Sequence, residues 1–201
     1  MDTPIFHFTH INNLSGIIQK GLLAENYISQ TYYVNIGDHA IKERRKRKSI
    51  VISGMQEENI HVGDCVPFYY AARSPMMYRQ FKQGKINNSD IIYLISYAEY
   101  IFRKYICYIS NKNAACETAF FYNTLQDLYN NIDWNIIRDT NWKSTNEHPD
   151  KMQRKMAEFL VYRRVLWGDI KWIVVFDNNT KNIIGHIKDK KILVRPDLYF
   201  G

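Results

Sequence analysis

Residues 66–78 read VPFYYAARSPMMY, and residues 157–162 read AEFLVY. The first segment combines aromatic side chains and an arginine with two prolines, so neither a regular strand nor a regular helix is expected to run through it undisturbed. The second segment sets one carboxylate, that of Glu158, at the head of an apolar strand. Because sites tend to lie where simple local rules conflict, we expect both segments to contribute to one.

The sequence on either side of these segments predicts an α+β protein. Strands are expected at residues 5–8, 91–96, 105–110, 158–165, 172–176 and 192–194. Helices are expected from residue 11 to 20 behind a cap at Thr9 or Asn12, from Asp38 through the basic residues, from Phe121 to Leu128, over 151–156 and along Ile183, Ile184 and Ile187. Residues 62–78 are expected to form loop and short strand. There is no repeat, no linker and no regular βαβ alternation, so we expect a single domain over residues 1–201.

The composition favours a protein that does not enter membranes. The chain has 201 residues, of which 46% are hydrophobic, and no apolar run approaches the roughly eighteen residues of a membrane span. The three cysteines, Cys65, Cys107 and Cys116, are odd in number and lack CxxC spacing, which argues against a disulfide framework or a zinc knuckle. We therefore expect a cytoplasmic protein with no membrane partner.

The charge is concentrated in one short segment. The net charge is +7, and residues 42–48 read KERRKRK. A solvated helix face and a phosphate-binding surface explain this segment about equally well. Fifteen tyrosines and four tryptophans favour single-stranded nucleic acid modestly, although most of these rings must lie in the core. Ile41 and Arg45 share a helical face, so Arg45 could point inward while its neighbours stay in water.

The common motifs of catalysis and nucleotide binding are missing. The sequence has no GxGxxG, no P-loop and no GxSxG. His7 and His10 are spaced i, i+3, but no third ligand lies near them in the sequence, so we expect no metal. From these residues alone, an enzyme and a nucleic-acid-binding module both stay open.

A set of segments, taken in order, resembles the DarT-type DNA ADP-ribosyltransferase toxins, relatives of the poly(ADP-ribose) polymerase and diphtheria-toxin superfamily. The segments are IFHFTHI at 5–11, NL at 13–14, GLL at 21–23, IKERR at 41–45, DCVPFYY at 64–70, IDW at 132–134, QRKMAEFLV at 153–161 and YF at 199–200. The pattern looks closest to the thymidine-modifying branch. The resemblance implies an ADP-ribosyltransferase-like fold, with central, split, mixed β-sheets flanked by helices, and NAD+ as co-substrate.

The resemblance also implies roles for individual residues. Glu158 would stabilise the positive charge that grows on the NAD+ ribose as nicotinamide leaves, and Arg45 would approach the acceptor base and stabilise its anion. The residues expected to bind NAD+ are His7, Thr9, Tyr69, Met76 and Arg73, the last either on a phosphate or as a brace of its loop. The residues expected to contact DNA are Lys42, Arg44, Arg47, Lys48, Lys112 and Asn113, the last two in the loop at 110–118 that would select the acceptor.

The function that the resemblance implies is that of a toxin. It would transfer ADP-ribose from NAD+ to a thymidine base, block replication, and be countered by a macrodomain-type antitoxin. Single-stranded DNA is the expected substrate, because a duplex hides thymine N3 in the base pair. Two alternatives stay open: a transferase acting on guanine, RNA or protein, and a non-enzymatic nucleic-acid-binding module that neither binds NAD+ nor needs Glu158.

Overall fold

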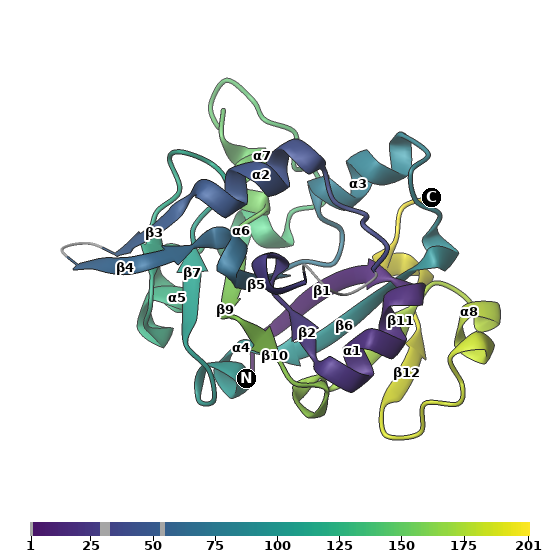
Figure 1. Ribbon diagram of the computed structural model, residues 1–201. Coiled ribbons are helices and arrows are strands. Elements are labelled where there is room, and N and C mark those ends of the chain that lie inside the picture. The colour runs from purple at the N-terminus through teal and green to yellow at the C-terminus, as the bar shows by residue number, and fades with distance from the viewer. Residues whose placement is uncertain (1, 29–32, 53–54) are drawn as a thin grey trace.

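The computed structural model describes residues 2–28, 33–52 and 55–201 (Figure 1). The strands are β1 (Pro4–His10), β2 (Leu22–Leu23), β3 (Ser49–Ile52), β4 (Met55–His61), β5 (Cys65–Tyr69), β6 (Ile91–Tyr97), β7 (Cys107–Ser110), β8 (Phe121–Tyr122), β9 (Glu158–Tyr162), β10 (Arg164–Val165), β11 (Trp172–Val175) and β12 (Lys191–Val194). The helices are α1 (Leu14–Lys20), α2 (His39–Arg47), α3 (Pro75–Lys82), α4 (Ala98–Phe102), α5 (Leu125–Asn131), α6 (Trp134–Arg138), α7 (Lys151–Lys155) and α8 (Asn178–Ile183).

The main sheet is mixed and nearly divided in two. Its strand order is β12-β11-β6-β1-β5-β9-β7-β8-β3-β4, and β2 pairs with β10 apart from it. The pairs β11 with β12 and β3 with β8 are parallel, and the other neighbours are antiparallel. The two halves meet at β1 and β5, which are joined by one residue pair, Phe6 with Tyr69. This arrangement confirms the predicted α+β fold and its split.

Both faces of the sheet are covered by apolar side chains. Alternate residues of a strand face opposite sides of a sheet. On β6, Ile92 and Leu94 belong to one apolar cluster, whereas Ile91 and Tyr93 belong to another. A strand covered on both faces is expected to be apolar along its length, and all residues from Ile91 to Ser96 are buried.

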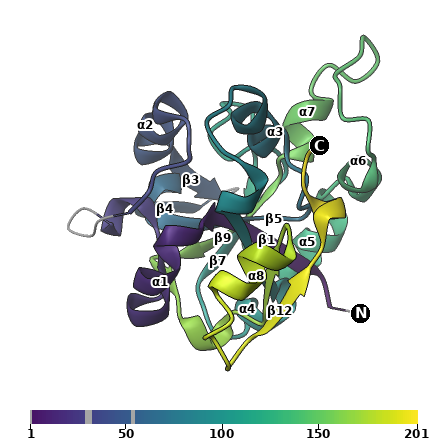
Figure 2. The ribbon, with the colours of Figure 1, turned by 90° about the vertical axis from the view of Figure 1, so that its right-hand side faces the viewer.

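The helices α2, α3 and α7 gather on one side of the molecule, above the central strands (Figures 1 and 2). At the end of β1 the chain turns into α1, which Gly21 ends as expected, with its φ of 84° in the region that favours glycine. Asp38 caps α2, because its carboxylate accepts hydrogen bonds from the N–H groups of Ala40 and Ile41. The predicted start of this helix is thus confirmed.

Several predicted boundaries are wrong. The expected helix from Phe121 begins only at Leu125, because Phe121 pairs in β8 with Ser110. The helix expected along Ile183 to Ile187 is α8, and it ends at Ile183. Neither expected cap serves α1, whose N-cap residue is Asn13.

Helix α3 begins at Pro75, within residues 62–78, where the sequence predicts only loop and short strand, and it continues to Lys82. Ser74 accepts a hydrogen bond from the N–H of Met77, and Pro75 stands at the first helical position, where a missing N–H costs nothing. The second proline of the segment therefore starts a helix. No helix among the described residues is both long enough and apolar enough to cross a bilayer.

Candidate active site

The Glu158 carboxylate lies where three strands come together. Glu158 is the first residue of β9, and it pairs with Tyr69, the last residue of β5, on one side and with Ser110, the last residue of β7, on the other. Its side chain is fully buried. Oε1 accepts a hydrogen bond of 2.9 Å from the N–H of Ala114, and Oε2 accepts one of 2.7 Å from Nη1 of Arg45. The strand register therefore places this carboxylate, and two donors hold it.

Arg45 reaches the carboxylate from α2. It is 8% exposed, whereas Arg44 and Arg47 on the same helix are exposed, as its shared face with Ile41 predicts. Burial opposes the charge of the guanidinium, but the charge of the nearby Glu158 and its hydrogen bond outweigh burial and raise the pKa of Arg45. The second terminal nitrogen, Nη2, is buried and has no hydrogen-bond partner among the described residues. A buried N–H donor without an acceptor lowers the stability of the folded protein unless a ligand supplies that acceptor.

The ring of His7 is neutral. Its Nδ1 lies 2.7 Å from the carbonyl oxygen of Pro67. Because a carbonyl only accepts, Nδ1 carries the hydrogen, and the neutral ring leaves Nε2 as an acceptor. Burial is the main reason that the pKa of His7 falls to about 4; the charges of Arg45 and Lys42 act in the same direction, and the bond to Pro67 opposes them.

A cleft opens beside these residues. It is lined from β1 by His7 and Thr9, from β5 by Tyr69, and also by Met76, Asn113 and the chain from Tyr33 to Asp38. The Tyr69 hydroxyl lies 3.9 Å from the sulfur of Met76. Burial, and secondarily the Glu158 charge, raise the pKa of Tyr69, so this phenol stays neutral. The structure thus brings Arg45 and four of the five predicted NAD+ residues to the cleft. Glu158 does not line the cleft itself, but it is bonded to Arg45, which does.

Arg73 is the fifth, and it does not line the cleft. Its guanidinium carbon lies 4.8 Å from the centre of the Phe200 ring, and the side chain is exposed. A cation over an aromatic face packs favourably. Of the two roles predicted for Arg73, its position favours the brace over the phosphate contact.

The predicted DNA contacts spread from the cleft over α2 and the loop at 110–118. Lys42 lines the cleft, donates to the Tyr33 hydroxyl and forms an ion pair with Glu25. Lys48 donates to the carbonyl of Glu117. Arg44 and Arg47 are exposed and form no ion pair within the described part of the chain.

In the loop, Lys112 is paired with Asp150 at 2.8 Å. The side-chain oxygen of Asn113, Oδ1, accepts the N–H of Ala115 at 2.9 Å, and its amide nitrogen lies 3.7 Å from the Met156 sulfur. A side-chain amide has two hydrogens and two oxygen lone pairs, so Asn113 can still offer a donor and an acceptor to a base edge.

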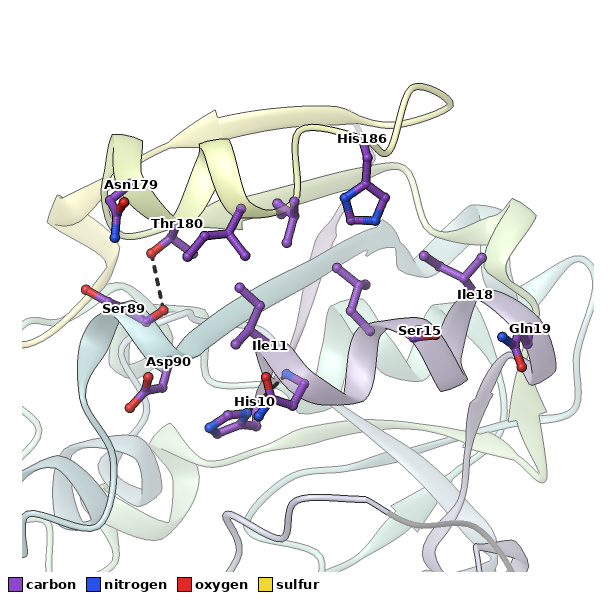
Figure 3. Close-up of a pocket in the computed structure, with 14 residues that line it drawn as sticks. His10, Ile11, Ser15, Ile18, Gln19, Ser89, Asp90, Asn179, Thr180 and His186 are labelled. Carbon is purple, nitrogen blue, oxygen red and sulfur yellow. Dashed lines mark hydrogen bonds between the residues drawn. The ribbon is translucent and has the colours of Figure 1, made fainter.

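A second hollow, of about 580 Å³, lies between the start of α1 and α8 (Figure 3). Ile11 and Ile18 point into it from the α1 side, and His10 and His186 stand at its rim. None of the predicted site residues lines it, so it is separate from the cleft. Among the residues that the structure describes, no three His, Cys, Asp or Glu side chains are grouped so as to hold a metal ion.

Comparison with known proteins assigns the chain to a family. The family model described as "ssDNA thymidine ADP-ribosyltransferase, DarT" matches residues 6–200. The chain belongs to the DarT family. A relative from Thermus sp. (strain 2.9), named DNA ADP-ribosyl transferase, is 29% identical over 211 residues, which cover 98% of this chain and 96% of the relative.

Two solved structures of Thermus sp. 2.9 DarT resemble the chain throughout. The complex with ADP-ribosylated ssDNA has a TM-score of 0.88 and 28% identity, covering 99% of this chain and 97% of the other. The complex with NAD+ has a TM-score of 0.81 and 27% identity, covering 99% and 98%. A relative from Thermosipho africanus, named a DNA ADP-ribosyl transferase-DNA ADP-ribosyl glycohydrolase fusion protein, is 26% identical over 199 residues, covering 98% of this chain and 48% of the relative. The predicted family and fold are confirmed.

Three further groups hold residues of the site, and the sequence did not point to them: the Ala114 N–H, which binds Glu158, and the Pro67 carbonyl and the Asn13 side chain, which line the cleft. Two of them are backbone groups, which carry no residue-specific signal. Asn13 does carry one, because it lies inside a segment of the resemblance, residues 13–14, between the first strand and α1.

Proposed function

We propose that this DarT-family chain transfers ADP-ribose from NAD+ to a thymidine base in single-stranded DNA. One observation carries the proposal: a fully buried carboxylate, Glu158, is held by a backbone N–H and by Arg45, and both Arg45 and Tyr69, its neighbour across the strands, line the cleft. The Thermus sp. 2.9 DarT complexes with NAD+ and with ADP-ribosylated ssDNA support the same co-substrate and acceptor.

The residues in the cleft fit NAD+. When bound, NAD+ supplies a positively charged leaving group on a ribose carbon. We assign Nε2 of the neutral His7 as an acceptor for a ribose hydroxyl, because Nδ1 is held by Pro67. Tyr69 presents an aromatic ring for the nicotinamide, with Met76 next to it. These contacts suit an uncharged sugar and a flat aromatic ring, and none of them requires a charged side chain.

Glu158 stabilises the positive charge that grows on the ribose as the glycosidic bond breaks. A carboxylate fixed in a dry site acts strongly on developing charge, since water does not screen it and it need not reorganise. In the complete reaction the C–N bond to nicotinamide breaks, a bond forms from the ribose carbon to thymine N3, and the N3 proton is lost. We assign the Glu158 carboxylate as the base that accepts this proton.

Arg45 contacts groups that act in both parts of the reaction, the cleavage of the bond to nicotinamide and the attack by the thymine base. Nη1 stays on Glu158, and we assign the unpartnered Nη2 to a carbonyl oxygen of the acceptor base. A thymine anion places negative charge on the oxygens beside N3, where an arginine can donate. The guanidinium therefore favours the ionised base and keeps Glu158 oriented.

We further propose that the chain is a toxin that blocks replication, that it acts in the cytoplasm, and that a macrodomain-type antitoxin reverses the modification. The fusion protein of Thermosipho africanus supports the pairing, because its name joins a transferase and a glycohydrolase in one polypeptide. Co-expression with such a glycohydrolase should relieve toxicity, whereas a glycohydrolase with an inactivated site should not.

The test of the activity uses NAD+ and matched oligonucleotides. One single strand contains thymidine, a second has every thymidine replaced, and a third is the RNA form of the first. Mass spectrometry should show one added ADP-ribose unit on the first alone. Addition to the others would support a different acceptor, and NAD+ left both intact and unbound would support the binding module.

A further inference from the structure

We infer that Asn13 is a positioning residue for NAD+ binding: it fixes the cleft wall at residues 33–38 and turns the Thr9 hydroxyl into a donor toward the cleft. This inference rests on the proposed function, because it assigns a role within the same cleft. None of the hydrogen bonds that the structure gives Asn13 reaches Glu158 or Arg45. Asn13 therefore acts on the cleft through Val34 and Thr9, to which it is bonded.

Three hydrogen bonds define the role of Asn13. Its Oδ1 accepts the N–H of Val34 at 2.7 Å. Its Nδ2 donates to the carbonyl of Val34 at 3.0 Å and to the hydroxyl oxygen of Thr9 at 3.0 Å. One side-chain amide thus pairs both backbone groups of Val34, as a neighbouring strand would, and reaches the end of β1 as well.

The wall has little else to hold its backbone. Residues 33–38 carry no helix or strand and lead into α2, which brings Lys42 and Arg45 to the cleft. Within the described ranges, the other hydrogen bond to the backbone of residues 33–37 is local, from the N–H of Gly37 to the side chain of Asn35. Among the residues that the structure describes, the Tyr33 side chain contacts Lys42, which donates to its hydroxyl and lies over its ring. Within the described part of the chain, Asn13 therefore supplies the hydrogen bonds that anchor the backbone of this wall to β1.

The Asn13 side chain also sets which way the Thr9 hydroxyl donates its hydrogen. A hydroxyl can accept two hydrogen bonds and donate one. Because Nδ2 of Asn13 already donates to the Thr9 oxygen, the Thr9 hydrogen is left for another acceptor, and Thr9 lines the cleft. Thr9 follows His7 by two residues on β1, so both point to the same face of the sheet. The cleft then offers a ligand one acceptor, at His7, next to one donor, at Thr9.

Only an asparagine fits all three bonds. Aspartate has the same shape and could still accept from the Val34 N–H, but it has no hydrogen for the Val34 carbonyl, which its charge repels. The Thr9 hydroxyl would turn and donate its hydrogen to the carboxylate, and so would be lost as a donor toward the cleft. A wall and a hydroxyl that are fixed in advance reduce the ordering cost of binding NAD+. Their loss should therefore weaken ground-state binding much more than it slows the chemical step.

The test compares Asn13→Asp with Asn12→Asp. Asn12 is the exposed neighbour, and its side chain makes no hydrogen bond within the described residues. For Asn13→Asp we expect the KM for NAD+ to rise about tenfold or more while kcat changes by less than about threefold. Asn12→Asp should keep the wild-type KM.

A second readout does not depend on activity. Backbone hydrogen exchange over residues 33–38 should speed up in Asn13→Asp and not in Asn12→Asp. If Asn13→Asp fails to fold, Thr9→Val replaces it, and this variant should raise the KM for NAD+ without changing that exchange. Equal KM values and equal exchange for the two aspartate variants would overturn the inference. A wild-type protein that binds NAD+ but modifies no DNA would instead count against the proposed function.

Discussion

Protonation of His7 should destabilise the protein as the pH falls from 7 to 5. The pKa of His7 is lowered from 6.5 to about 4, chiefly by burial. At pH values between these two pKa values, His7 is protonated in the unfolded chain but not in the folded protein. The free energy of unfolding therefore rises with pH across this window and falls as the pH is lowered through it.

The magnitude follows from the two pKa values. A difference of about 2.5 units corresponds to a ceiling of about 3.4 kcal/mol at low pH. Applying the linkage relation to the same values gives a loss of roughly 1.8 kcal/mol between pH 7 and pH 5. This is an upper value, because the ring is only partly buried and solvent screens part of the effect.

The assay is urea unfolding of wild type and His7→Asn at both pH values. Asparagine places an N–H near the position of Nδ1, so it can keep the bond to the Pro67 carbonyl while removing the titrating ring. Other groups that titrate in this range contribute to both proteins and cancel in the comparison. The wild type should lose roughly 1 kcal/mol more than the variant on going to pH 5, and no more than about 1.8 kcal/mol.

The reasoning fails if the two proteins lose the same stability within about 0.5 kcal/mol, which is a common limit for comparing variants. In that case the ring of His7 is protonated as easily in the folded protein as in the unfolded chain. A direct NMR titration of the His7 ring in the folded protein would then give an ordinary value, and Nε2 would not be a fixed acceptor at pH 6.

Three other predictions test the catalytic pair, the basic helix and its cap. Glu158→Gln should reduce DNA modification by about a thousandfold or more while the circular dichroism spectrum stays unchanged; more than a tenth of the activity remaining would contradict the assignment. Replacing Arg44 and Arg47 together by Gln should lower the slope of log affinity for single-stranded DNA against log salt by about 1.4, with the KM for NAD+ unchanged. An unchanged slope would mean that these side chains only face water. Asp38→Ala should lower the free energy of unfolding by about 1 kcal/mol, because two N–H groups at the start of α2 lose their acceptor; an unmoved urea midpoint would show that the cap adds nothing.

Local sequence predicted much of the framework of the site. An apolar run behind Glu158 predicts a buried strand with a carboxylate at its head, and β9 has this form. The i, i+4 spacing of Ile41 and Arg45 predicts that the arginine turns inward, because the two share a helical face. Both predictions depend only on the local pattern of apolar residues, which the fold preserves.

The rest depends on contacts between residues far apart in the chain. Arg45 and Glu158 are 113 positions apart, and nothing local indicates that they meet. Phe121 has helical spacing with Leu125, but pairing with β7 places it in a strand, so tertiary structure overrides the local preference. The local sequence does not predict α3, because a proline usually interrupts a helix, whereas Pro75 occupies the first helical position, where its missing N–H is not needed.

The division of the sheet and the chemistry of His7 have the same origin, Pro67. Continued antiparallel pairing beyond Phe6 and Tyr69 would set Phe8 opposite Pro67. The N and O atoms of a strand residue point to the same neighbouring strand, and the Pro67 oxygen faces β1, since His7 binds it. A proline has no N–H to give to β1, so the ladder cannot continue there. The carbonyl that is left over takes the ring hydrogen of His7 instead, which fixes the neutral imidazole beside the gap between the two half-sheets. The residue that stops the pairing thus also sets the tautomer of the histidine that lines the cleft.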